Sequence, residues 1–226
     1  MILESIVTTI NEDGTPNISP MGPNVSDSIE IFELRPFDTS RTFANLKRSK
    51  SGVLHVTDDV ELFAKSAIGK LDRLPELIPA ELVAGNIIAD SCRAYEFKVE
   101  YIDETGPRMN LNCKTIKSHR LRDFWGFNRA KHAVLEAAIL ATRLDFLPSG
   151  EIRDQYLRLA TAVEKTGGDK EKLAFELLTN FVSEKEAANF EAGKFETGNS
   201  DAENPETDAS APDQSNDDVD RKTSRA

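Results

Sequence analysis

Cysteine is scarce in this chain: only Cys92 and Cys113 occur among its 226 residues. Two cysteines cannot form a disulfide scaffold or a four-cysteine zinc site, so we expect two buried thiols in a reducing compartment. No apolar run approaches the roughly 18 residues that a membrane-spanning helix needs. The segment Met1–Ile6 lacks the basic start and the cleavage site of a secretory signal. These absences predict a cytoplasmic globular protein that does not enter a membrane.

The sequence signatures of several enzyme classes are also missing. No Gly-x-Gly-x-x-Gly follows an expected strand and no Walker-type loop is present, so we expect neither kind of nucleotide site. The three histidines, His55, His119 and His132, are isolated, without a His-Glu-x-x-His pattern or a nucleophile elbow. We therefore expect no metal site, interpret His55 as a structural residue of a strand, and name no catalytic side chain.

Positive charge is in the minority, with 28 Lys and Arg against 39 Asp and Glu and a net charge of −11. This balance argues against nucleic acid as a partner, although a local basic cluster could still bind one small anion. Residues 193–226 contain nine acidic and four basic residues and almost no large apolar ones. We predict that 193–226 is a disordered acidic tail, an acidic interaction segment being the alternative.

Alternating and β-branched stretches dominate residues 1–122 and predict six strands in a closed or partly open antiparallel barrel. Asp13-Gly14 is typical of the turn between the first two strands. Pro20, inside the second, indicates a sheet edge, a bulge or a strand end, because proline cannot donate to the ladder. The expected strands are 3–10, 15–21, 28–34, 52–57, 94–102 and 109–117. Two short helices, 38–48 and 58–65, interrupt them, and Pro75 and Pro79 indicate a loop before the fifth strand.

Alanine and leucine at helical spacing take over in residues 123–192. They predict three helices, of which the first opens at Asn128-Arg129-Ala130 and the second stops at Gly167-Gly168. We interpret this part as a helical subdomain that serves as a lid or a dimerisation layer. The chain is therefore expected to be an α+β protein with the divisions 1–122, 123–192 and 193–226.

The segment from Arg35 to Leu46 carries a candidate anion site. Thr39, Ser40, Arg41 and Thr42 lie where a strand passes into a helix, and the free amides of a helix start favour anions. A guanidinium can add bidentate hydrogen bonds to phosphate oxygens. The alternative is an ordinary capped helix whose arginine points into water.

A second candidate segment lies in the strand that contains Pro20. Proline and glycine in Ser19-Pro20-Met21-Gly22 leave backbone groups without ladder partners, and such groups can bind the edge of a planar ring. Met21 offers a soft contact to the face of a ring. The alternative is a bulge of the barrel without any ligand.

Together these segments resemble those of the flavin-binding split-barrel proteins, in particular the flavin-reductase-like branch. The resemblance is carried by Val7-Thr8-Thr9, Asp13-Gly14-x-x-Asn17-x-Ser19-Pro20, Asp38-Thr39 ahead of Asn45-Leu46, and Gly52-Val53-Leu54-His55-Val56. The later segments Gly126-Phe127-Asn128-Arg129-Ala130 and 136–143 resemble one subgroup, the domain-of-unknown-function family numbered 447. The resemblance implies a six-stranded antiparallel split β-barrel that binds FMN in a homodimer, with the flavin near the subunit interface.

The resemblance also implies roles for individual residues. Thr39, Ser40, Arg41 and Thr42 would surround the phosphate, and Asn45 would fix the helix or contact the ribityl chain. The isoalloxazine would be bordered by Ser19, Pro20, Met21 and Gly22, with Asn24 at its edge. Phe37 stands where many flavin reductases have lysine, so Arg41 or Arg35 would supply the charge. Arg129 and His132 would close the pocket over a substrate or lie on the helix surface.

The implied activity is that of an FMN-dependent oxidoreductase, in which the flavin carries the electrons to a small-molecule substrate and the protein orients it. Two alternatives stay open at this point. One is a non-catalytic FMN-binding or sensor protein, and the other is a flavin-free dimeric scaffold.

Overall fold

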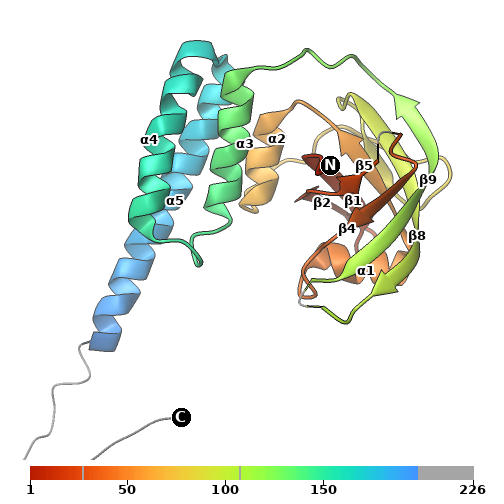
Figure 1. Ribbon diagram of the computed structural model, residues 1–226, viewed down its shortest axis with the longest axis horizontal. Helices are drawn as coiled ribbons and strands as arrows, with labels where there is room; N and C mark the ends of the chain where they lie inside the picture. The colour runs from red at the N-terminus through yellow and green to blue at the C-terminus, as the bar shows by residue number, and fades with distance from the viewer. Residues whose placement is uncertain (27, 107, 198–226) are drawn as a thin grey trace, which may run out of the picture. The chain divides into compact units, whose positions relative to one another are not determined.

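The computed structural model describes residues 1–26, 28–106 and 108–197, of which Met1–Ala188 belong to one compact unit (Figure 1). These residues contain nine strands and five helices. The strands are β1 (Ser5–Ile10), β2 (Pro16–Met21), β3 (Asn24–Val25), β4 (Ile31–Leu34), β5 (Ser51–Val56), β6 (Leu77–Pro79), β7 (Asn86–Ile88), β8 (Arg93–Asp103) and β9 (Asn110–Arg120). The helices are α1 (Arg41–Ser49), α2 (Val60–Ala67), α3 (Arg129–Ala141), α4 (Ser149–Thr166) and α5 (Asp169–Thr197).

Seven strands form one antiparallel sheet in the order β2-β1-β5-β8-β9-β4-β3, and β6 and β7 pair separately. The prediction of six strands is therefore wrong: all six are present with shifted ends, and β3, β6 and β7 are added. These three have two or three residues each, too few to show the alternation by which a strand is recognised. The pair β6 and β7 occupies the segment in which Pro75 and Pro79 predicted only a loop.

The seven-stranded sheet curls, and the residues before β1 meet the segment that follows β2. The Leu3 amide donates to the Pro23 carbonyl at 3.0 Å, and the Val25 amide donates to the Met1 carbonyl at 2.8 Å. Because β3 lies at the far end of the sheet from β2, these bonds bring the two ends of the sheet together. The result is the curled half-barrel seen at the right of Figure 1.

Strand β2 forms an edge of the sheet, which confirms one of the interpretations of Pro20. It pairs only with β1, in a register that runs from Ser5 opposite Met21 to Ile10 opposite Pro16. The predicted turn is present between them, with Gly14 at a φ of +83°, a conformation that favours glycine. Backbone groups on the outer side of β2 therefore have no neighbouring strand to bind within the described part of the chain.

The core of the half-barrel is built from alternating residues of its strands. Phe32 of β4 and Phe97 of β8 pack edge to face with centroids 5.2 Å apart. Helix α1 covers this core with Phe43 and Leu46, the two residues that helical spacing predicted. The position of α1 next to β2 is thus fixed by burial of its apolar face.

A second core holds the helical layer together. Helix α3 contributes mostly alanines, whose small side chains let α2 and α4 approach closely. Val60 and Ala64 of α2 belong to this cluster, while Leu62 and Phe63 of the same helix face the half-barrel with Ile6. Helix α2 therefore joins the two cores.

The three predicted C-terminal helices are confirmed as α3, α4 and α5. Helix α5 continues to Thr197, so residues 193–197, which were expected to belong to the disordered tail, are helical. A segment with too few apolar residues to predict a helix can still be helical when it continues an established helix, because extending a helix is easier than starting one. The remainder of the predicted tail, 198–226, lies outside the described residues.

Candidate functional site

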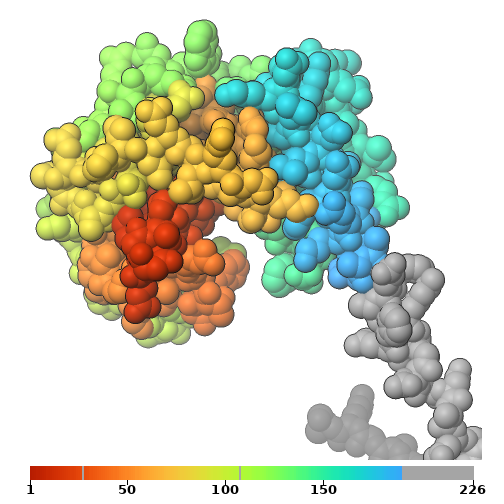
Figure 2. Space-filling model, turned by 180° about the vertical axis from the view of Figure 1, so that it is seen from behind, coloured from red at the N-terminus to blue at the C-terminus, as the bar shows by residue number. Residues whose placement is uncertain are grey.

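A cavity of about 340 Å³ lies between the end of β2 and the helices α2 and α3, and we call it the strand cavity. Seen from behind, the surface is hollowed between the half-barrel and the helical layer (Figure 2). The four residues that the sequence assigned to a planar ring, Ser19, Pro20, Met21 and Gly22, all line this cavity. The rest of its lining is Glu4, Phe37, Phe63, Ser66, Ala67, Leu135, Ala138, Ile139 and Thr142.

The strand cavity has two unlike walls. One wall is the edge strand β2, which offers the Ser19 hydroxyl and outward backbone groups. The other wall is mostly apolar, with Phe63 of α2 and Leu135 and Ile139 of α3 as its largest side chains. A flat ring with a polar edge and an apolar face suits such a cavity, because each wall satisfies one part of it.

The start of α1 carries part of the predicted anion site. The Ser40 side chain caps the helix, accepting from the Phe43 amide at 3.1 Å and donating to the Phe37 carbonyl at 2.7 Å. Thr39 and Arg41 are exposed beside it. Among the described residues, no acidic side chain pairs with Arg41 within 4 Å. A guanidinium at a helix start is thus available for an anion.

Thr42 and Asn45 are placed differently, because both are buried and face β1 and β2. The Asn45 amide donates to the Thr9 hydroxyl at 3.0 Å and to Asn11 Oδ1 at 2.8 Å. The Asn17 amide donates to the Thr42 hydroxyl at 3.1 Å. Of the two roles implied for Asn45, these contacts match the one that fixes the helix.

Asn24 does not line the strand cavity. It begins β3, where its side chain oxygen lies 3.4 Å from the Met1 amine. Phe37 does line the cavity, two residues before Thr39, and the Arg108 guanidinium lies 4.3 Å from the centre of its ring. Sequence reasoning missed Arg108, which comes from the loop between β8 and β9 and has no local signal that places it here.

A second cavity, of about 540 Å³, adjoins the first, and we call it the aromatic cavity. The two cavities share Glu4, Phe63 and Leu135. The remaining lining is Ile2, Leu3, Val56, Thr57, Asp58, Val60, Phe124, Gly126, Phe127, Asn128, Lys131, His132 and Glu136. His132 thus lines a cavity, whereas Arg129 is exposed on α3 and lines neither of the two.

Glu4 lies at the junction of the two cavities. Burial raises the pKa of its carboxyl, the charge of Glu136 raises it further, and Arg143 opposes both. The net direction is upward, so Glu4 holds its proton to a higher pH than a carboxyl in water does.

Asp58 forms a charged cluster at the edge of the aromatic cavity. Its Oδ1 accepts from Arg122 at 2.5 Å, and its Oδ2 lies 3.2 Å from the Lys131 ammonium. Burial raises the pKa of Asp58, but the hydrogen bonds from Arg122 and Lys131 lower it by more, so the carboxyl is ionised. Cys92 lies next to Arg122, with Sγ 3.2 Å from a guanidinium nitrogen, and burial raises the pKa of its thiol.

Both cysteines are buried and free, as predicted. The structural interpretation of His55 is also confirmed, because its ring is fully buried between the Ile6 carbonyl, 3.2 Å from Nδ1, and the Ile88 amide, which donates to Nε2 at 3.1 Å. Burial lowers its pKa to about 4. In the described ranges, no three His, Cys, Asp or Glu side chains are placed to share a metal ion.

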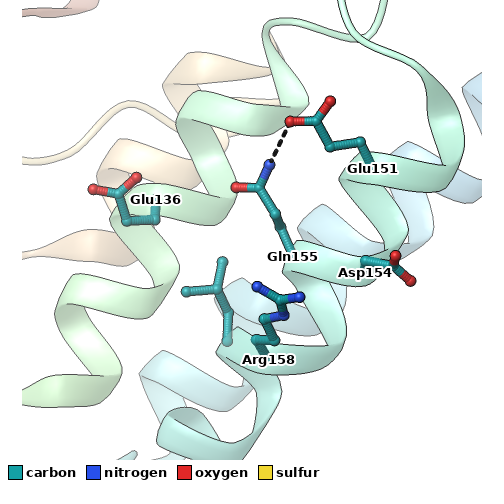
Figure 3. A pocket seen from close by; sticks show the side chains of 6 residues that line it. Glu136, Glu151, Asp154, Gln155 and Arg158 are labelled. Carbon is teal, nitrogen blue, oxygen red and sulfur yellow. Dashed lines mark hydrogen bonds between the residues drawn. The ribbon is translucent and has the colours of Figure 1, made fainter.

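A further hollow, of about 600 Å³, is a surface groove between α3 and α4 rather than part of this site. Figure 3 shows that it is lined by Glu136, Glu151, Asp154, Gln155 and Arg158. Three carboxylates against one guanidinium repel a phosphate, so this groove does not suit FMN.

Two family models match the chain. The model of the DUF447 N-terminal domain, a protein of unknown function, matches residues 3–122, and a second DUF447 model matches 128–180. No curated protein matches. Over the described parts of the chain, no helix combines the length and the apolar character needed to cross a bilayer.

Solved structures of similar fold include an FMN-bound protein of DUF447 from Methanosarcina mazei, with 24% identity and a TM-score of 0.68. That alignment covers 80% of this chain and 94% of the other. A flavoredoxin from Methanosarcina acetivorans has 12% identity and a TM-score of 0.46, covering 53% and 68% of the two chains. A 2-nitrobenzoate 2-nitroreductase from Pseudomonas fluorescens has 18% identity and a TM-score of 0.44, covering 51% and 63%.

Proposed function

Since the chain belongs to the DUF447 family of proteins of unknown function, we propose that it binds FMN and moves electrons through it to a small-molecule substrate. The observation that carries this proposal is the strand cavity. Its lining contains all four residues that the sequence assigned to an isoalloxazine and also Phe37, four residues before Arg41, although Arg41 itself is not part of the lining. The similar Methanosarcina mazei protein is FMN-bound, which supports FMN as the ligand.

The two walls of the strand cavity determine how FMN would lie. Ser19 and the outer backbone groups of β2 would bind the polar edge of the ring, while Phe63 and Leu135 would cover its apolar face and exclude water. Arg41 and the first amides of α1 would bind the phosphate. Bound FMN would supply the electron transfer, and the protein would orient the ring and its partner.

A homodimer with the flavin near the interface is part of the proposal. Large apolar side chains are exposed near the two cavities, among them Ile2 and Phe37. Burial of such side chains against a second copy would contribute to association. Light scattering coupled to size-exclusion chromatography tests this directly: a mass of one chain at micromolar concentration would contradict it.

The phosphate assignment is tested with Arg41→Ala. Loss of a bidentate, charge-assisted contact is expected to weaken FMN binding by about tenfold to 100-fold. Arg48→Ala is the matched control, because it removes the same charge from the other end of α1, where the side chain binds the Ile10 carbonyl. Equal FMN affinity of the two variants in a fluorescence titration would reject the assignment.

Electron transfer is tested on the FMN-loaded protein without oxygen. Bleaching of the flavin colour by NADH or NADPH, followed by its return with an electron acceptor, is the result expected of an oxidoreductase. FMN that binds but is not reduced by any donor would favour the non-catalytic alternative. A protein that is isolated colourless and does not take up added FMN would leave only the scaffold.

A further inference from the structure

The aromatic cavity has no part in holding FMN in the assignment above, yet it is the larger of the two adjoining cavities. Its walls come from segments distant in the chain: residues 2–4, the start of α2, the 124–128 segment and one face of α3. Because Glu4, Phe63 and Leu135 line both cavities, a molecule in one lies next to a molecule in the other. That is the arrangement that electron transfer between two bound rings requires.

Aromatic rings form one end of this cavity. Phe127 and His132 are stacked, with centroids 6.0 Å apart and planes 25° from parallel. Phe124 packs edge to face on Phe127 at 6.2 Å. Phe127 is nevertheless 92% exposed, so a ring face is free to receive a further planar molecule.

The charge of the lining selects against anions. Three carboxyl groups, Glu4, Asp58 and Glu136, line it beside one ammonium, Lys131. Asp58 is buried and already paired with Arg122 and Lys131, so its oxygens are closed to a ligand. Glu4 and Glu136 form no ion pair with any described residue, and their oxygens are the acceptors left for a ligand that brings N–H donors.

We propose that the aromatic cavity binds the electron-exchange partner of the flavin, and that this partner is a planar aromatic ring with N–H donors, neutral or positively charged and without phosphate. That the bound molecule exchanges electrons with the flavin rests on the proposed function, whereas the class of molecule that the cavity binds does not. Phe127 and His132 stack on the ring, and Glu4 and Glu136 accept from its donors. Phosphates of a nicotinamide dinucleotide do not suit this lining, so such a donor would approach from elsewhere.

The test uses two probes with the same ring system, 2-aminobenzimidazole and benzimidazole-2-carboxylate. Their binding to the full chain is measured by calorimetry and by ligand-observed NMR, with and without FMN. The amine is expected to bind and the carboxylate to bind at least fivefold more weakly. Tighter binding of the carboxylate, or displacement of the amine by FMN, would overturn the proposal.

Two variants locate the probe. Phe127→Ala is expected to weaken binding of the amine about threefold to tenfold, because a stacking partner is lost. Phe146→Ala is its control, because Phe146 is also a largely exposed phenylalanine, at 78%, and lines neither cavity. Glu4→Gln is expected to weaken the amine about twofold to fivefold relative to Glu12→Gln in the exposed turn after β1. Unchanged affinity in both Phe127→Ala and Glu4→Gln would overturn the placement.

The FMN titration separates this proposal from the previous one. A protein that binds FMN but not the amine would refute the aromatic cavity as a ligand site and leave the flavin assignment intact. A protein that binds the amine with the expected variant effects, but not FMN, would have a ligand site of the inferred chemistry without a flavin function.

Discussion

Replacement of Asn45 by alanine distinguishes a residue that positions α1 from one that contacts the ligand. The Asn45 side chain is 2% exposed and makes two hydrogen bonds, to Thr9 and Asn11. Each such bond contributes about 1 kcal/mol net, and a buried partner left with fewer bonds adds to the loss. We therefore expect Asn45→Ala to lower the free energy of unfolding by about 2–3 kcal/mol. For a domain of this size that corresponds to roughly 5–10 °C in Tm.

Urea denaturation followed by circular dichroism measures the change in stability, and an FMN titration at a temperature where both proteins are folded measures the affinity. Because the amide groups of Asn45 point to β1, the affinity for FMN is expected to fall by less than about threefold, through a small shift of α1. Lys47→Ala, an exposed change on the same helix, is the control and should alter stability by less than about 0.5 kcal/mol. A variant of normal stability that has lost FMN binding tenfold or more would show that Asn45 contacts the ribityl chain.

The remaining predictions concern buried charges. The pKa of His55 is about 4 when folded and about 6.5 when unfolded, so the unfolded chain binds more protons between these values. Stability is therefore complete above pH 6.5 and is lost as the pH falls towards 4, by up to about 3 kcal/mol. Denaturation of the wild type and of His55→Gln across this range should give a steeper pH slope for the wild type, and parallel curves would contradict the reasoning. Arg122→Ala removes the partner of the buried Asp58 carboxylate and is expected to cost about 3 kcal/mol. Arg120→Ala breaks only the exposed pair with Asp123 and should lower the free energy of unfolding by less than about 0.5 kcal/mol in the same assay. Equal losses of stability in the two variants would show that the burial of Asp58 does not make its ion pair more important.

Features with a local physical cause were predictable from the sequence. The Ser40 cap accepts from an amide three residues later, and the missing N–H of Pro20 favours a sheet edge, a bulge or a strand end, of which the structure has the edge. The same holds for Gly14, because a tight turn needs its positive φ. These local constraints correctly identified β2 and α1, the two elements on which the flavin assignment depends.

Features that depend on contacts between distant segments were not predictable. Arg108 lies over Phe37 only because the loop between β8 and β9 folds back toward the start of α1. Glu96 is fully buried in β8, where it accepts the amides of residues 81–83 and a hydrogen bond from His119 at 2.7 Å. Neither contact can be predicted from a periodicity or a motif, because the partners are far apart in the sequence.

The aromatic cavity belongs to the same group. Its walls are brought together by α2, whose opposite faces belong to two different cores, and no single segment carries its pattern. Phe124 and Phe127 lie in a segment that helical spacing treats only as the approach to α3. Their exposure becomes informative once the tertiary structure shows that they border a cavity.

The two prolines of β2 have a consequence for how the protein behaves at high concentration. An edge strand usually invites a strand from a neighbouring molecule, and continued addition of this kind leads to aggregates. Pro16 and Pro20 offer no amide hydrogen to an incoming strand, so the sheet resists extension on this side while its carbonyl oxygens remain open to small molecules. The same two residues thus keep the edge available to a ligand and closed to another polypeptide.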